Sequence, residues 1–347
     1  MPCQAISLLF VAFSLAVASC SGCRSGSKTA NGSVTIQGAG ATFPAPLYQK
    51  WFADYHAAHP EVRVSYLSTG SGAGIDLFTE GKADFGASDA GMTDEQIDKV
   101  QGGVQLLPVT AANVVLAYNL PGFSGNLKLS RDAYAGIFLG TITNWDDPKI
   151  AESNQGASLP KLKISPIHRQ AASGTTFVFT QHLSAINDAW KRGPGKGMTV
   201  VWPAGTAARG SDDMVALIQK EPGSIGYLDY GHAEKSKLPM AWLQNKSGEY
   251  VKPSLESGQA TLNSTPLPEN LRGWVPDPEG KDSYPIVTYT WLLVRKHDGN
   301  SRTTAALKDV LKYCLTDGQN DSVALGYIPL PEKVRQAELQ AVDAIAQ

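Results

Sequence analysis

An alternation of strand-like and helix-like segments constrains the fold of this chain more than any other feature of its sequence. Short runs rich in β-branched and aromatic residues are followed by runs in which apolar residues recur with helical spacing. We predict strands at 33–37, 62–66, 83–89, 163–168 and 224–229, and helices at 44–59, 75–80, 175–185 and 211–220. This order is typical of an α/β fold, and 347 residues suffice for two domains of ordinary size.

The helix predicted at 44–59 has the clearest apolar face. Its large side chains recur at helical spacing and are Leu47, Tyr48, Trp51, Phe52 and Tyr55. A proline at the start and Pro60 after the end suit the two termini of a helix. In the helix predicted at 211–220, Ser211 is the expected N-cap.

Three of the predicted connections are rich in serine, threonine and glycine, and each leads into a predicted helix. They span residues 38–43, 68–74 and 169–174. A helix leaves its first backbone N–H groups without partners, and its positive dipole end favours an anion. The hydroxyl groups add donors, and Arg169 adds a planar fork of donors suited to a tetrahedral oxyanion. One such loop alone is most often a capped turn, whereas three with the same chemistry favour an anion site.

The charge composition indicates how an anion would be attracted. Lys and Arg number 30 and Asp and Glu number 32, which gives a net charge of −2. This balance offers no electrostatic basis for binding nucleic acid, and no cluster of basic residues suggests a membrane-surface patch. An anionic ligand must therefore be attracted by local groups.

Longer motifs around these loops resemble those of a known family. They lie at 38–46, 83–89, 142–146, 169–180, 222–227 and 284–286. In this order they resemble the substrate-binding protein of the high-affinity phosphate ABC transporter, over about residues 34–335. The resemblance implies an α/β, two-lobed periplasmic-binding-protein fold of type II, with the ligand in a hinged interdomain cleft. Lobe one would comprise 34–109 plus 285–347, and lobe two 110–284.

The same resemblance implies a function and a set of site residues. Such a protein binds inorganic phosphate and delivers it to permease subunits, as a monomer, without cofactor, metal, nucleic acid or enzymatic activity. The residues implied to contact phosphate are Thr42, Phe43 through its backbone N–H, Ser71, Asp89, Arg169, Ser173, Gly174 and Thr175.

Asp89 is the unexpected member of this set, because a carboxylate repels an anion. Two like charges 4 Å apart repel by about 4 kcal/mol at an effective dielectric constant near 20. The contact becomes favourable when the ligand carries a proton that Asp89 can accept. Phosphate carries one near neutral pH and sulfate does not, so Asp89 is expected to reject sulfate but not arsenate. From the local sequence alone, Asp89 would instead be the N-cap of a helix at 92–100.

The chain departs from the family pattern beside Arg169. The family commonly has an acidic residue two positions after the arginine, followed by glycine, whereas this chain has Ala171 and Ala172. We therefore expect Arg169 to be oriented by another acid, or to be held less rigidly, with some loss of preorganisation.

The N-terminal region resembles that of an exported lipoprotein. Residues 1–19 carry no charged side chain and contain an apolar run too short to span a bilayer, which is typical of a signal peptide. The sequence before Cys20 resembles a lipobox, which implies an acylated Cys20, a bacterial membrane anchor and a flexible tether at 20–33. An ordinary secretory peptide is the alternative. Cys314 is the only cysteine of the predicted folded region, so that region cannot form an internal disulfide, and Cys314 is predicted to be a small core residue.

Other functions remain open at this point. The sequence contains no G-x-S-x-G, H-E-x-x-H or Walker A motif, and His56 and His59 are expected to be ordinary surface residues. The alternatives are a binding protein for another tetrahedral oxyanion (arsenate, sulfate or molybdate), a surface sensor without a transporter, or a phosphohydrolase built on the same cleft.

Overall fold

The computed structural model describes residues 32–265, 268, 272–273, 276–297, 299 and 301–346. The predicted signal peptide at 1–19, Cys20 and nearly all of the tether at 20–33 lie outside the described residues. Within the described part of the chain, no helix combines the length and the apolar character needed to cross a bilayer.

The secondary structure alternates as predicted. The strands are β1 (Val34–Gly40), β2 (Val62–Ser68), β3 (Phe85–Ser88), β4 (Val104–Tyr118), β5 (Lys128–Leu129), β6 (Ser165–Arg169), β7 (Thr206–Ala208), β8 (Ser224–Asp229), β9 (Trp242–Gln244), β10 (Tyr250–Val251) and β11 (Val287–Arg295). The helices are α1 (Ala45–Ala58), α2 (Ser71–Thr79), α3 (Asp94–Ile97), α4 (Arg131–Phe138), α5 (Pro148–Ala151), α6 (Gly174–Ile186), α7 (Asp188–Arg192), α8 (Ser211–Lys220), α9 (Tyr230–Lys235), α10 (Leu255–Ser264), α11 (Ser301–Leu315) and α12 (Glu332–Asp343). Short 3-10 helices are η1 (Glu152–Asn154), η2 (Asp317–Asp321) and η3 (Val323–Leu325).

One eight-stranded mixed sheet runs through the structure in the order β2-β1-β3-β11-β4-β8-β6-β7. Its two ends are parallel, since β1 pairs with β2 and β3, and β6 pairs with β7 and β8, in parallel register. The central strands β11 and β4 run antiparallel to their neighbours. A separate three-stranded sheet has the order β10-β9-β5. The predicted α/β architecture is confirmed.

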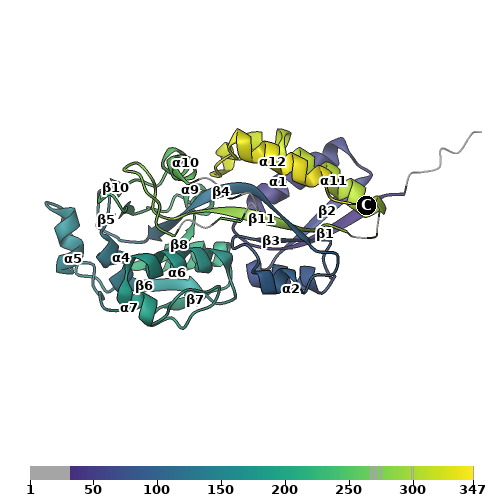
Figure 1. The fold of residues 1–347 in the computed structure, drawn as a ribbon. Helices are drawn as coiled ribbons and strands as arrows, with labels where there is room; N and C mark the ends of the chain where they lie inside the picture. Colours follow the sequence, from purple (N-terminus) through teal and green to yellow (C-terminus); the bar gives the residue numbers. More distant parts are fainter. Residues whose placement is uncertain are drawn as a thin grey trace, which may run out of the picture. The chain divides into compact units, whose positions relative to one another are not determined.

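The long strand β4 divides this sheet into two halves. Its residues from Val104 to Asn113 pair with β11, whereas those from Val114 to Tyr118 pair with β8. We call β2-β1-β3-β11 with the start of β4 the first half-sheet, and the end of β4 with β8-β6-β7 the second half-sheet. In Figure 1, α1, α11 and α12 lie over one face of the first half-sheet and α2 lies on the other. Helix α6 packs against β8 of the second half-sheet.

The predicted core positions are confirmed. All five large side chains of the α1 face are buried, and they pack against β2 and α11. Cys314 of α11 is also fully buried and forms no disulfide with the described residues. His56 and His59 are exposed, as expected.

Two of the predicted loops are shorter than expected. β1 continues through Gly40, and α2 begins at Ser71, whereas the sequence predicted a loop until residue 74. Glycines disfavour a helix by propensity, but here packing decides: a Cβ on Gly74 would come within 2.4 Å of the Gly40 Cα. Gly70, with a φ of 100°, provides the turn between β2 and α2.

The predicted cap of α8 is wrong by one residue. Gly210 is the N-cap, and Ser211 is the first helical residue. The Ser211 hydroxyl lies 3.1 Å from that of Thr42, in the turn that follows β1.

Candidate functional site

The N-termini of α2 and α6 meet from opposite half-sheets. The Gly72 N–H donates to the Ala172 carbonyl, which lies just before α6, at 3.1 Å. A Cβ on Gly174 would come within 2.6 Å of Ser71 Oγ and 2.8 Å of the Asp89 Cβ. The structure therefore brings Ser71, Asp89 and Gly174 together, although they come from three predicted motifs.

Two serine hydroxyls at this meeting point are oriented as donors. Ser71 Oγ accepts the Asp89 N–H at 3.2 Å, and Ser173 Oγ, the N-cap of α6, accepts the Thr176 N–H at 3.3 Å. A hydroxyl that accepts a backbone N–H still carries one proton, which it can donate to an anion. The N–H of Gly174, at the first position of α6, also has no partner within the helix.

The Asp89 carboxylate lies at the end of β3 and is almost completely buried, with 1% of the residue exposed. Thr175 Oγ1 of α6 donates to Oδ2 at 3.2 Å, and Thr290 Oγ1 of β11 donates to Oδ1 at 3.0 Å. The alternative role as a helix cap is wrong, since Thr93 caps α3 through a capping box. Asp89 is thus a buried acceptor at the centre of a group of donors.

The Asp89 carboxyl changes its protonation state close to neutral pH. Burial raises its pKa to about 7, while the hydroxyls of Thr290 and Thr175 and the charge of Arg169 lower it and the charge of Asp229 raises it. A carboxyl that changes charge near neutrality can donate or accept a proton, depending on what lies against it.

Arg169 ends β6 and is also buried, with 5% of the residue exposed. Its backbone N–H donates to the Tyr227 hydroxyl at 3.0 Å, and Nη2 donates to the Arg209 carbonyl at 3.3 Å. Among the described residues, Nε has no hydrogen-bond partner and no carboxylate forms an ion pair with Arg169. Within the described part of the chain, a backbone carbonyl therefore orients this guanidinium and no acid does. The other alternative, that Arg169 is held less rigidly, stays a prediction.

Thr42 and Phe43 lie beside the N-terminus of α8. Thr42 Oγ1 is 3.1 Å from Ser211 Oγ, so that one of these hydroxyls donates to the other across the two half-sheets. The Phe43 carbonyl accepts the Tyr327 hydroxyl at 2.8 Å, which fixes the peptide between Phe43 and Pro44. Arg169 connects this region to the rest of the site, because its partner Arg209 directly precedes the α8 cap.

Sequence reasoning missed two residues of this group. Ser211 followed a glycine and began a helix, so it carried the same signal as the three loops but was interpreted only as a cap. Thr290 carried no signal, because a threonine in a strand is explained by β propensity alone.

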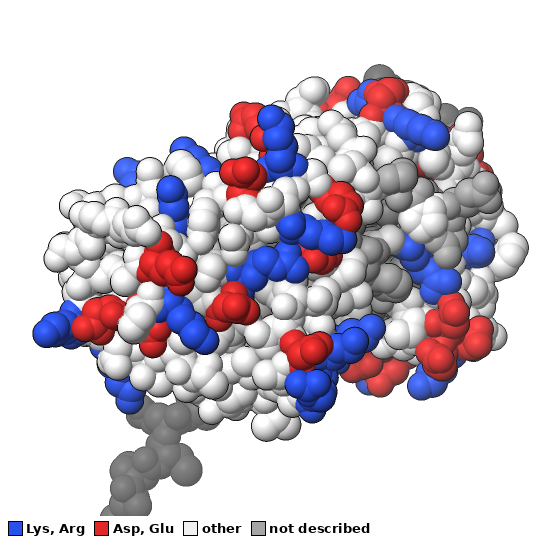
Figure 2. All heavy atoms as spheres, turned by 60° about the vertical axis from the view of Figure 1, so that its left-hand side comes forward, with Lys and Arg blue, Asp and Glu red and all other residues white. Residues whose placement is uncertain are grey.

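The charges on the face shown in Figure 2 do not form a large patch of one sign. Figure 2 shows Lys and Arg side chains interspersed with Asp and Glu across the face. The buried guanidinium of Arg169 is a positive charge that lowers the pKa of Asp89. Local attraction therefore fits this face better than long-range steering.

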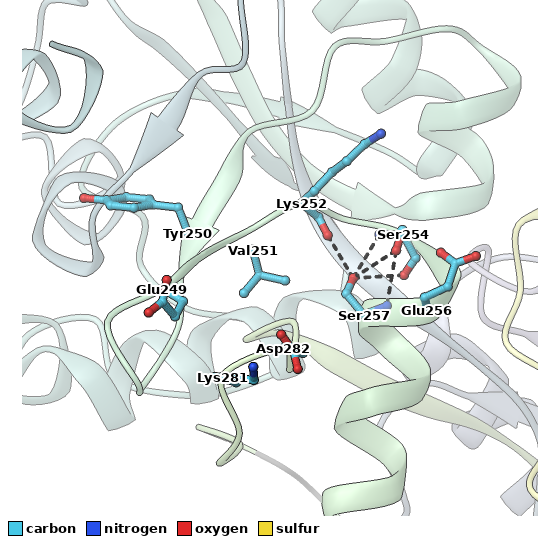
Figure 3. A pocket seen from close by; sticks show the side chains of 9 residues that line it. All are labelled: Glu249, Tyr250, Val251, Lys252, Ser254, Glu256, Ser257, Lys281 and Asp282. Atoms are coloured by element: carbon cyan, nitrogen blue, oxygen red, sulfur yellow. Dashed lines mark hydrogen bonds between the residues drawn. The ribbon is translucent and has the colours of Figure 1, made fainter.

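A separate surface hollow of about 560 Å³ contains none of the predicted site residues (Figure 3). It is lined by charged side chains of both signs and by Ser254 and Ser257. These serines form the capping box of α10, and Ser257 Oγ lies 2.9 Å from the Lys252 carbonyl, its acceptor. The hydrogen bonds drawn in Figure 3 therefore serve to begin α10, and we assign no ligand here.

The strand order and the site between two half-sheets define a class, the two-lobed α/β ligand-binding proteins. Solved structures confirm this fold: a phosphate-binding protein from Stenotrophomonas maltophilia aligns with a TM-score of 0.72 at 20% identity, covering 89% of this chain and 94% of the other. The phosphate-bound PfluDING protein aligns with a TM-score of 0.71 at 20% identity, covering 87% and 92%. The expected two-lobed fold is therefore confirmed.

Closer sequence relatives identify the family. A family model described as a PBP superfamily domain matches residues 25–317. The phosphate-binding protein PstS of Pasteurella multocida is 39% identical over 306 residues, 87% of this chain and 88% of the relative. That of Methanocaldococcus jannaschii is 38% identical over 339 residues, 90% and 87% of the two chains. The chain belongs to the PBP superfamily and, within it, to the PstS family of phosphate-binding proteins.

Proposed function

We propose that this protein binds inorganic phosphate between its two lobes and delivers it to the permease subunits of an ABC transporter for import. The observation that carries the proposal is the presence in one site of a buried acceptor, Asp89, and a buried arginine, Arg169, whose Nε–H has no partner among the described residues. A protonated oxyanion needs both an acceptor and several donors. The relatives named phosphate-binding proteins support the same ligand, and the chain is a binding protein rather than an enzyme.

In this proposal, the residues implied by the family resemblance contact the anion. They are Thr42, Phe43, Ser71, Asp89, Arg169, Ser173, Gly174 and Thr175. We add Ser211, because its hydroxyl shares a hydrogen bond with Thr42 at the start of α8. The lobes would divide at about residues 109 and 285, within β4 and just ahead of β11, so that the two long strands carry the hinge.

We also propose that the mature protein is a monomer held outside the cytoplasm by an acylated Cys20. Metabolic labelling with palmitate tests the acylation of Cys20: the wild type should be labelled and Cys20→Ser should not. Equal labelling of the two proteins would contradict it.

Calorimetric titration at about pH 8 tests the ligand. Phosphate should bind with one site per chain, arsenate should compete, and sulfate should bind at least about 100-fold more weakly, because an ionised Asp89 repels an anion without a proton. Sulfate affinity should increase as the pH falls below about 7, where Asp89 becomes protonated. Equal affinities for phosphate and sulfate at about pH 8 would contradict the proposed role of Asp89. A chromogenic phosphate ester should remain unhydrolysed.

A further inference from the structure

Thr290 lies behind Asp89, on a strand that the predicted site did not include. It is fully buried, and its Oγ1 lies 3.0 Å from Asp89 Oδ1 and 3.5 Å from the Ser88 carbonyl. Two residues earlier on the same face of β11, Thr288 Oγ1 donates to the Asp89 backbone carbonyl at 3.1 Å. The two threonines therefore contact different parts of one residue: Thr290 the carboxylate and Thr288 the main chain.

A break in strand pairing occurs at Thr290. β11 pairs Thr290 with Thr110 but Trp291 with Pro108, so that Val109 of β4 has no partner across the ladder. The carbonyl of Val109 instead accepts from the Gln319 side chain at 2.9 Å. This irregularity is a β-bulge, and β-bulges often change the direction of side chains next to functional sites.

The two hydroxyls on Asp89 differ in origin. Thr175 reaches Oδ2 from α6, beside the second half-sheet, whereas Thr290 reaches Oδ1 from β11, which pairs directly with β3. Hinge opening would therefore remove Thr175 from Asp89 and leave Thr290 in place. Thr290 is the contact that Asp89 keeps in both states.

The other charged or titratable groups facing Asp89 come from several elements. Arg169 of β6 favours the carboxylate, and Asp229 of β8 opposes it. Three buried tyrosines on α1, on β2 and after η3 couple weakly to Asp89, and burial raises their pKa values, which keeps them neutral: Tyr48, Tyr66 and Tyr327. Of the groups that lower the pKa of Asp89, the Thr290 hydroxyl acts most strongly.

We propose that Thr290 is a specificity-determining positioning residue, whose hydroxyl holds the Asp89 carboxylate ionised and oriented so that the site accepts protonated oxyanions and rejects sulfate. This inference rests on the proposed phosphate-binding function. A hydrogen bond to the charged form of an acid favours that form, and Thr290 supplies this bond from a fixed strand. Without it, Asp89 would hold its proton at higher pH and could donate to sulfate.

The test compares Thr290→Val with Thr290→Ser. Phosphate and sulfate affinities are measured by calorimetry between about pH 5.5 and about pH 9. For Thr290→Val, we expect sulfate to bind about tenfold more tightly relative to phosphate at pH 7. We also expect the midpoint of the selectivity profile to move up by about one pH unit, a tenfold change in proton affinity. Thr290→Ser keeps the hydroxyl and should restore the wild-type profile.

Thr288→Val is the matched control, because it removes a buried hydroxyl from the same strand face that bonds to main-chain carbonyls, those of Asp89 and Tyr289, and not to the Asp89 carboxylate. Its selectivity midpoint should stay where it is in the wild type. The proposal is overturned if Thr290→Val keeps the wild-type ratio and midpoint, or if it loses both anions equally at every pH. If the wild type itself fails to bind phosphate, the proposed function fails instead. Should Thr290→Val not fold, Thr290→Ala, which also lacks the hydroxyl, takes its place, and a wild-type ratio and midpoint in Thr290→Ala would likewise overturn the proposal.

Discussion

At the scale of single residues, the alanines after Arg169 are the clearest departure from the family pattern. Ala171 is exposed, and Arg169 is oriented by the Arg209 carbonyl at 3.3 Å. We expect Ala171→Asp to add a partly exposed partner and to raise phosphate affinity about two- to fivefold, the range of a partly exposed ion pair. Ala171→Asn is the uncharged control. Equal phosphate affinities of the two variants, measured by calorimetry, would contradict the idea that Arg169 is held less rigidly.

Glu338 of α12 is a buried carboxyl outside the proposed phosphate site. Both of its oxygens are buried without hydrogen-bond partners among the described residues, and burial raises its pKa to about 9. The unfolded chain loses this proton near the ordinary pKa of glutamate, so unfolding releases a proton between there and about pH 9, and stability falls as pH rises through that window.

Glu338→Gln removes this pH dependence. We expect the variant to unfold several degrees above the wild type at about pH 8.5 and to show little advantage near pH 4, where the wild-type carboxyl is protonated in both states. Thermal unfolding monitored by circular dichroism at several pH values measures this. Parallel stability profiles for the two proteins would show that Glu338 does not titrate as described.

At the scale of elements, the close contact between the starts of α2 and α6 leaves no room for a side chain at Gly174. Its Cβ would lie 2.6 Å from Ser71 Oγ and 2.8 Å from the Ala90 nitrogen. We expect Gly174→Ala to separate the two helix starts and to lower phosphate affinity at least about 100-fold, because misplaced donors lose most of their effect. A lower thermal stability of Gly174→Ala together with unchanged phosphate affinity would contradict this account.

The elements were largely predictable, and their pairings were not. The apolar face of α1 and the strand β8 follow from local periodicity, and the glycine-rich motifs placed Ser71 and Gly174 near helix starts. The partnership of Thr42 with Ser211, which are 169 residues apart, depends on how the half-sheets meet. The start of α2 at Ser71 was missed for a similar reason, since packing on Gly40 overrides the weak helix propensity of glycine.

At the scale of the whole molecule, one ion pair joins the proposed lobes among the described residues. Arg272 Nη1 lies 2.7 Å from Asp94 Oδ1 and donates to the Met92 carbonyl at 3.2 Å. The pair is partly exposed, so its contribution to closure is modest, about 1 kcal/mol or less.

Asp94→Asn should therefore weaken phosphate binding by up to about fivefold, mainly through faster dissociation, because the closed state loses a contact that the open state lacks. Stopped-flow measurement of phosphate release would show this. Glu279→Gln, which breaks the pair of Glu279 with Lys246 inside one proposed lobe, is the control and should leave the rate unchanged. Equal release rates for Asp94→Asn and the wild type would remove the pair from the closure mechanism.

The central position of β11 has a consequence for how the chain is made. Asp89 and its partner Thr290 are 201 residues apart, and β3 finds its second neighbour only when β11 pairs with it. During synthesis, one edge of β3 therefore stays unpaired until nearly the whole chain has emerged from the ribosome. Such non-local pairing makes folding slow. A nascent chain that stops short of β11 would carry every family motif up to residue 227 and still be unable to assemble a phosphate site.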